Sequence, residues 1–165
     1  MVYKDPKWDF HSLGLARDLP AADSYAEVLN ATDPNLRSFF ARGGKLLQYH
    51  GWSDAEISPW NSIDYYKSVI GALGGSSKVD KSYRLFMIPG MGHCGDGEGL
   101  NMFDPISPLE QWVERGTVPT SIPASHVEEG KTVRTRPLCP YPQEAVYKES
   151  GSTDEAANFS CRLRK

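Results

Sequence analysis

Two short apolar runs constrain the fold of this chain more than any other feature. The first covers residues 45–50 (KLLQYH) and the second covers residues 83–88 (YRLFMI), and glycine follows closely after each. Apolar runs of this length with glycine at their ends predict buried β-strands. Between them, residues 58–73 begin with Ser-Pro, carry apolar side chains at helical spacing and end at a pair of glycines, which predicts a helix.

Three further helices are expected, at residues 21–29, 33–42 and 105–114. Helices that alternate with strands are typical of the α/β class, in which parallel strands are joined by crossover helices. Two strands are too few for a stable parallel sheet, because such strands are covered on both faces and paired at both edges. The pattern therefore predicts the last part of a larger sheet.

The two ends of the chain differ from this middle part. Residues 1–20 are aromatic, charged and irregular, and Pro6 and Pro20 are expected to interrupt any helix there. The tail from Thr117 onward is expected to lack long regular elements because it is rich in proline. Its prolines are Pro119, Pro123, Pro137, Pro140 and Pro142.

Charge and hydropathy exclude two classes of partner. The chain has 18 basic and 21 acidic residues and a net charge of −3, without a concentrated basic face, so no nucleic-acid partner is expected. No apolar run approaches the roughly 20 residues that span a bilayer, so no membrane partner is expected. The start, MVYKDPKWDF, lacks the apolar core of a signal peptide, as would any fragment that begins in the middle of a gene.

Asp54 and His93 follow the two predicted strands in matching places, 39 residues apart. In open α/β sheets, sites are built by the loops at the carboxyl ends of the strands. An acid followed by a histidine is also the order that an α/β-hydrolase needs after its nucleophile. Two plainer interpretations stay open: Asp54 could cap the following helix, and His93 could be a surface residue in a glycine-rich loop.

A metal site and a nucleophile within the chain are both poorly supported. His93 and Cys94 are adjacent, but the other histidines (His11, His50 and His126) are scattered and no ligand pair has zinc-type spacing. Asp96 and Glu98 are expected to be solvated rather than to bind calcium. No Gly-x-Ser-x-Gly elbow occurs, and the serines near residues 76 and 152 lie in polar loops.

Four blocks of sequence together resemble the tannase and feruloyl esterase family. Residues 43–59 resemble its catalytic-aspartate region, and residues 84–95 (RLFMIPGMGHCG) resemble its catalytic-histidine region. Residues 136–142 (RPLCPYP) and 158–161 (NFSC) resemble its C-terminal signature. The blocks occur in family order over residues 33–161, which makes the match more specific than any lone motif.

The resemblance implies an α/β-hydrolase fold with Asp54 and His93 as the acid and base of a Ser-His-Asp triad. It also implies a disulfide between Cys139 and Cys161. Cys94 would pair with a cysteine next to the serine, upstream of the residues present here. Two glycosylation patterns, at Asn30 and Asn158, are compatible with a secreted protein.

The resemblance divides the chain into three parts. Residues 1–32 would return from the family's lid domain to the hydrolase core, residues 33–118 would form the C-terminal half of that core, and residues 119–165 would form a Pro-rich, disulfide-stapled tail. The nucleophile elbow and the lid, with the calcium site that the lid often carries, would lie outside the chain. No cofactor is therefore expected in these residues.

Three hypotheses for function follow. The first is a secreted carboxylic ester hydrolase of the tannase and feruloyl esterase type, acting on small feruloyl, galloyl or related aromatic esters of plant cell walls and tannins, of which this chain is a fragment without the serine. The second is a truncated, non-catalytic remnant with at most a binding role. The third, a metal-binding module, predicts stoichiometric zinc.

Overall fold

The computed structural model describes residues 2–93 and 95–164, which form two compact units, Met1–Asp33 and Pro34–Lys165. The first unit contains η1 (Phe10–Ser12), α1 (Leu15–Asp23) and α2 (Ala26–Leu29). Pro20 lies inside α1, so the expectation that it interrupts a helix was wrong. The buried carboxylate of Asp18 accepts a hydrogen bond from the Gly14 N–H at 2.8 Å and so satisfies one of the free donors at the start of α1.

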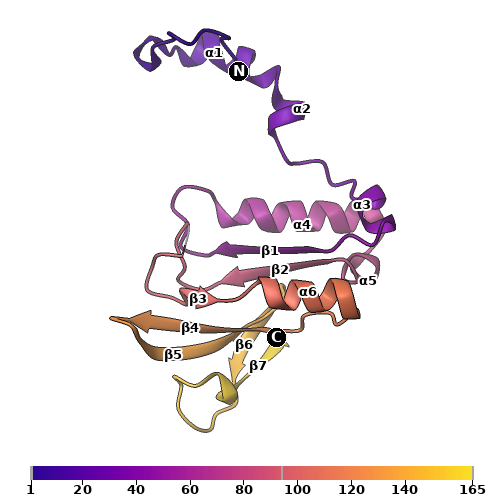
Figure 1. Cartoon of the computed structure of the whole chain (residues 1–165), viewed down its shortest axis with the longest axis vertical. Helices are drawn as coiled ribbons and strands as arrows, with labels where there is room; N and C mark the ends of the chain where they lie inside the picture. The colour runs from indigo at the N-terminus through magenta and orange to yellow at the C-terminus, as the bar shows by residue number, and fades with distance from the viewer. Residues whose placement is uncertain (1, 94, 165) are drawn as a thin grey trace. The chain divides into compact units, whose positions relative to one another are not determined.

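The second unit is built around the predicted pair of strands. β1 (Leu46–Gly51) and β2 (Tyr83–Ile88) are parallel neighbours, with Leu46 opposite Tyr83. They are preceded by α3 (Arg37–Ala41) and joined through α4 (Pro59–Leu73) and α5 (Ser76–Val79). Figure 1 shows α4 running alongside the two strands. The α/β prediction and the positions of both strands are confirmed.

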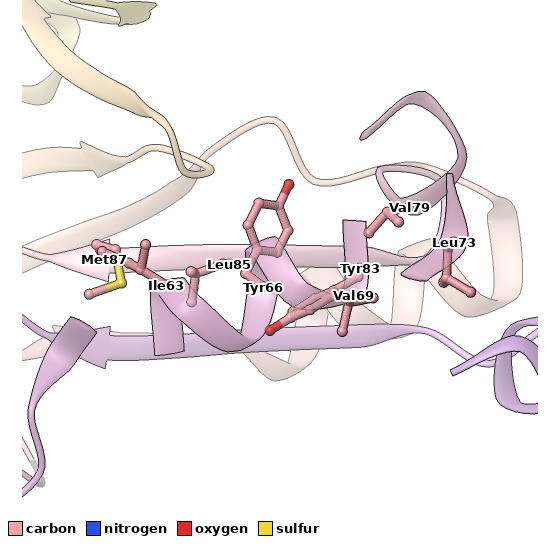
Figure 2. Packing of buried hydrophobic residues seen from close by; sticks show 8 residues of the cluster. All are labelled: Ile63, Tyr66, Val69, Leu73, Val79, Tyr83, Leu85 and Met87. Atoms are coloured by element: carbon pink, nitrogen blue, oxygen red, sulfur yellow. The ribbon is translucent and has the colours of Figure 1, made fainter. Parts of the chain in front are cut away.

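The face of β2 toward α4 carries one apolar core. Tyr83, Leu85 and Met87 alternate along the strand and pack against side chains of the helices (Figure 2). The helical members of this cluster are Ile63, Tyr66, Val69, Leu73 and Val79. Gly74 ends α4 with a φ of 81°, a conformation that glycine adopts without steric cost.

The other face of β2 carries a second core. Phe86 and Ile88 are fully buried there, together with residues from the segments that follow. These partners are Met91, Leu100, Ile122, Ala124 and Leu138. Because both faces are covered, β2 is a continuous apolar run rather than an alternation of polar and apolar residues.

The proline-rich tail has more regular structure than its composition predicts. Before the tail come β3 (Met102–Phe103) and α6 (Ile106–Arg115), the latter close to the expected helix at 105–114. The tail itself forms β4 (Ile122–Glu128) and β5 (Lys131–Leu138), and the three strands make an antiparallel sheet in the order β3-β4-β5. The expected absence of long elements was therefore wrong. Pro123 lies directly opposite Pro137, and two opposed prolines fit at a pair whose N–H groups make no ladder hydrogen bond.

The end of the chain covers one edge of the parallel sheet. Pro140 forms an isolated antiparallel bridge with Phe86, and the Tyr141 N–H donates to the Leu85 carbonyl at 2.7 Å. β6 (Gln143–Tyr147) and β7 (Phe159–Leu163) then form an antiparallel pair, with η2 (Ala156–Asn158) before β7. Residues 34–165 thus form a single compact unit in which core and tail are packed together.

Candidate active site

The loops that follow β1 and β2 are joined by backbone hydrogen bonds. The Trp52 N–H donates to the Ile88 carbonyl at 2.9 Å, and the Ser53 N–H donates to the Met91 carbonyl at 3.0 Å. A Cβ atom at Gly51 would lie 2.1 Å from the carbonyl oxygen of Met91, so only glycine permits this approach. The two loops are therefore held in contact at the carboxyl edge of the sheet.

The loop after β2 folds back on itself through further glycines. Gly90 has a φ of 72°, and the Gly99 N–H donates to its carbonyl at 3.0 Å. A Cβ atom at Gly99 would lie 1.9 Å from the carbonyl oxygen of Pro89. This close packing of backbone on backbone turns the loop and returns His93 over the edge of the sheet.

Asp54 and His93, predicted from their positions after the strands, are in direct contact. Oδ2 of Asp54 lies 2.8 Å from Nδ1 of His93, a hydrogen-bond distance for a charge-assisted pair. The Asp54 side chain is only 2% exposed, whereas the His93 side chain is 42% exposed. A buried carboxylate thus holds one nitrogen of an accessible imidazole and leaves Nε2 as the nitrogen for a reacting group.

The second oxygen of Asp54 is held by its own loop. Oδ1 accepts the backbone N–H groups of Glu56 at 2.9 Å and of Ile57 at 2.8 Å. The N-cap position of α4 is Ser58, so Asp54 shapes the turn before the helix instead of capping the helix itself. The turn holds Oδ1, which leaves Oδ2 to contact the imidazole of His93.

These contacts lower the pKa of Asp54 and raise the pKa of His93. The pKa of Asp54 lies well below its usual value, chiefly because the Ile57 N–H stabilises the anion, with His93, the Glu56 N–H and His50 adding to the effect. The pKa of His93 is raised, first by its hydrogen bond to Asp54 and then by the charge of that carboxylate. The pair therefore stabilises an ionised acid and a protonated base.

His50 is a third member of the site that the sequence patterns did not identify. Its Nε2 lies 3.0 Å from Oδ2 of Asp54, the same oxygen that His93 binds, and its Nδ1 lies 2.7 Å from the hydroxyl of Ser62. By sequence, His50 is one of several scattered histidines. The available signal was its position four residues before Asp54, at the end of a strand whose other residues are largely apolar.

The remaining predicted residues are placed as follows. Cys139 and Cys161 form a disulfide with a Cα–Cα distance of 5.4 Å. Cys94 lies outside the described residues. Asn30 is exposed at the end of α2, whereas Nδ2 of Asn158 donates to the Ser152 carbonyl at 2.9 Å, a hydrogen bond that an attached sugar would disturb.

Two features are absent from the described residues, 2–93 and 95–164. In this part of the chain, no group of three or more histidine, cysteine, aspartate or glutamate side chains is arranged to hold a metal ion. No helix within the same ranges is both long and apolar enough to cross a membrane.

Comparisons with known proteins identify the family to which the chain belongs. The family model described as tannase and feruloyl esterase matches residues 4–162. A mono(2-hydroxyethyl) terephthalate hydrolase from Piscinibacter sakaiensis is 46% identical over 134 residues, which are 79% of this chain and 22% of that protein. A probable feruloyl esterase from Arthroderma benhamiae is 36% identical over 167 residues, which are 96% of this chain and 31% of that protein.

A solved structure of an esterase is also similar to this chain. A crystal structure of an esterase from Aspergillus oryzae superposes with a TM-score of 0.81 at 31% identity, over 98% of this chain and 36% of that one. The chain thus spans between about a fifth and about a third of the length of these relatives. Its fold is α/β-hydrolase-like, and the chain belongs to the tannase and feruloyl esterase family.

Proposed function

We propose that this chain is the acid–base portion of a carboxylic ester hydrolase that works by a Ser-His-Asp triad. Asp54 and His93 supply the acid and the base, and the serine comes from polypeptide outside these 165 residues. The single observation that carries the proposal is the 2.8 Å contact between buried Oδ2 of Asp54 and Nδ1 of accessible His93. This is the arrangement that a triad requires of its carboxylate and imidazole.

The chemistry follows from the two ring nitrogens. With Nδ1–H held by Asp54, neutral His93 presents a lone pair at Nε2, which accepts the proton of the serine hydroxyl as its oxygen attacks the ester carbonyl. The same proton passes to the departing alcohol, leaving an acyl-enzyme. Water then attacks that acyl group in a second cycle, releasing the carboxylic acid and restoring the serine. Asp54 remains ionised throughout and stabilises the imidazolium in each cycle.

The nucleophile is assigned outside the chain on the basis of sequence and coverage. No Gly-x-Ser-x-Gly elbow occurs in these residues, and the family relatives extend well beyond the matched region. On this proposal, the oxyanion-hole donors, the lid with any calcium site, and the partner cysteine of Cys94 also belong to that outer part.

The proposed substrates are small esters of aromatic acids, such as feruloyl and galloyl esters of plant material. Support comes from the relatives, which are named for the hydrolysis of terephthalate and feruloyl esters. We also infer secretion, because the disulfide between Cys139 and Cys161 is typical of proteins that fold in oxidising compartments.

The test compares two proteins: this chain alone, and the chain extended by the coding sequence that precedes it. Each is assayed for hydrolysis of methyl ferulate and methyl gallate and for labelling by a serine-directed fluorophosphonate. The extended protein is expected to turn over ester and to be labelled at one upstream serine, and the 165-residue chain to do neither.

Three outcomes would overturn the proposal. If the His93→Gln variant of the extended protein kept full turnover, His93 would not be the base. An upstream sequence with a stop codon or no serine elbow would instead favour a non-catalytic remnant. Labelling of a serine within these residues would move the nucleophile into this chain.

A further inference from the structure

A line of polar side chains crosses the apolar interior between α4 and the two parallel strands. It begins at Tyr83, which is fully buried in β2, and continues through Gln48 of β1 and Ser62 of α4. From Ser62 it passes to His50 at the end of β1 and reaches Asp54. Buried polar groups are costly unless each one is hydrogen-bonded, so a continuous line of them calls for a reason.

Each link in the line is a direct hydrogen bond. The Tyr83 hydroxyl donates to Oε1 of Gln48, and Nε2 of Gln48 donates to the Ser62 hydroxyl oxygen at 2.9 Å. That oxygen lies 2.7 Å from Nδ1 of His50, and Nε2 of His50 lies 3.0 Å from Oδ2 of Asp54. Burial raises the pKa of Tyr83, which keeps its hydroxyl protonated as the first donor.

The partners of His50 determine which of its nitrogens carries hydrogen. Nε2 faces Oδ2 of Asp54 and, at 3.1 Å, the carbonyl oxygen of Ile57. Both of these oxygens only accept, so Nε2 must be the donor. Nδ1 of the neutral ring is then an acceptor, and the Ser62 hydroxyl supplies its hydrogen. All donors in the line therefore point the same way, toward Asp54, and hydrogen bonds aligned in this manner strengthen one another.

We propose that His50 is a positioning residue for the reaction: it holds the Asp54 carboxylate in the orientation in which Oδ2 accepts the Nδ1–H of His93. Ser62, with the groups behind it, fixes the His50 tautomer that can do this. The inference rests on the proposed function, because the orientation of Asp54 matters only if His93 is the base. On this inference, His50 contributes to the reaction through Asp54 without contacting the reacting atoms.

The pattern of β1 supports this role. Gln48 and His50 are two residues apart and therefore lie on the same face of the strand, the face toward α4. The facing residues of β2 on that side are apolar, and the neighbouring core is made of aromatic and aliphatic side chains. Apolar side chains at these two positions would suit packing alone. Polar ones make sense if their hydrogen bonds reach a charged group whose orientation must be kept.

The sharpest test changes the hydroxyl that sets the tautomer. In the esterase that contains this chain, Ser62→Ala removes the donor to Nδ1 of His50, whereas Ser62→Thr keeps a hydroxyl. We expect kcat of Ser62→Ala to fall about fivefold, the size of one lost hydrogen bond, with KM unchanged, and Ser62→Thr to recover most of the rate. Ser68→Ala is the matched control, because Ser68 lies on the exposed surface of α4, where its hydroxyl donates to the Asp64 carbonyl.

A second pair of variants removes the imidazole itself. His50→Phe deletes the donor to Asp54, and we expect a roughly 10- to 100-fold lower kcat at unchanged KM, the range in which misplacement of a catalytic group is felt. His50→Gln keeps an N–H close to the place of Nε2 and is expected to restore part of this loss. Should His50→Phe fail to fold, the Ser62→Ala and Ser62→Thr pair decides the matter.

An independent readout is the NMR signal of the His93 Nδ1–H that Asp54 binds. We expect Ser62→Ala and His50→Phe to shift this signal and speed its exchange with water, and Ser68→Ala to leave it unchanged. A wild-type kcat and signal in Ser62→Ala and His50→Phe, with His93→Gln inactive, would overturn this inference alone. An active His93→Gln enzyme would instead overturn the proposed function together with the inference.

Discussion

The acid loop and the histidine loop of this site are built very differently. Asp54 is buried, and its two oxygens receive two backbone N–H groups and two imidazoles. His93 is 42% exposed and is held on one side by Asp54. The carboxylate is thus fixed by the fold whether or not His93 is present, whereas the orientation of His93 depends on the carboxylate. On the proposed function, this difference keeps the charged carboxylate fixed and leaves the imidazole that would transfer protons accessible.

On the proposed function, the largest expected effect comes from replacing His93 and Asp54 in turn in the full-length protein. His93→Gln removes the base and should lower kcat by about 10⁶-fold, whereas Asp54→Asn keeps a base with the wrong tautomer and should lower it by about 10⁴-fold. Steady-state kinetics on methyl ferulate measure both, with circular dichroism to check folding. A larger loss for Asp54→Asn than for His93→Gln would contradict the view that Asp54 acts by orienting His93.

A smaller effect is expected from separating the two loops. Gly51→Ala would place a methyl group 2.1 Å from the Met91 carbonyl oxygen, and relief of that clash should cost about 1–3 kcal/mol of unfolding free energy. The matched control is Gly71→Ala in α4, where an added Cβ meets nothing within 4 Å. That change should stabilise the helix by about 0.5–1 kcal/mol. Denaturant titration of both variants tests this, and equal stabilities would contradict the close approach of the loops.

The titration of His93 should reveal how far it depends on Asp54. Its pKa is raised, so activity that needs the neutral ring should increase with pH through a midpoint above the ordinary value of about 6.5. In Asp54→Asn the first cause of the shift is gone, and an NMR titration should find the His93 midpoint at lower pH. An unchanged midpoint would mean that the contact with Asp54 does not govern the base.

The same shift links pH to stability. Because the folded protein binds the His93 proton more tightly than the unfolded chain does, this contribution to stability is fully present below about pH 6.5. It is lost as pH rises through the folded-state pKa. Asp54→Asn should therefore reduce the difference in unfolding free energy between pH 6 and pH 9, as measured by denaturant titration at the two values.

The smallest effect is expected within the acid loop. The N–H groups of Glu56 and Ile57 donate to Oδ1 of Asp54 and should be protected from hydrogen exchange. Asp54→Ala should remove that protection, while the Gly99 N–H, bonded to the Gly90 carbonyl in the histidine loop, should keep its own. An equal loss of hydrogen-exchange protection in both loops would show that they open together. The acid loop and the histidine loop would then not differ in local stability.

The parts of the fold that could be predicted from the sequence are those where burial and backbone geometry agree. β2 was predicted at its observed bounds because both of its faces are covered, which leaves an uninterrupted apolar run. The end of α4 was predicted because Gly74 and Gly75 follow it directly. Topology predicted that Asp54 and His93 lie at the same edge of the sheet, since parallel neighbours bring their following loops to one edge, and the family resemblance predicted that they form a pair.

The parts that could not be predicted depend on partners that are distant in sequence. β4 and β5 contain prolines that weaken a strand pattern, and only their cross-strand pairing shows that Pro123 and Pro137 are opposite each other. His50 has no distinctive local pattern, because its role depends on Ser62 twelve residues later and on the turn at Asp54.

The bridge between Pro140 and Phe86 also makes the two edges of the parallel sheet differ in their ability to pair with a further strand. The nitrogen of proline carries no hydrogen, so the segment over β2 offers a poor template for another strand at that place. Within residues 2–93 and 95–164, no segment pairs with the opposite edge, that of β1. Unpaired strand edges are where chains associate wrongly. Any strand that joins this sheet, from its own polypeptide or from a neighbouring molecule during misassembly, is therefore expected to add beside β1, which makes that edge the one to shield when the chain is produced by itself.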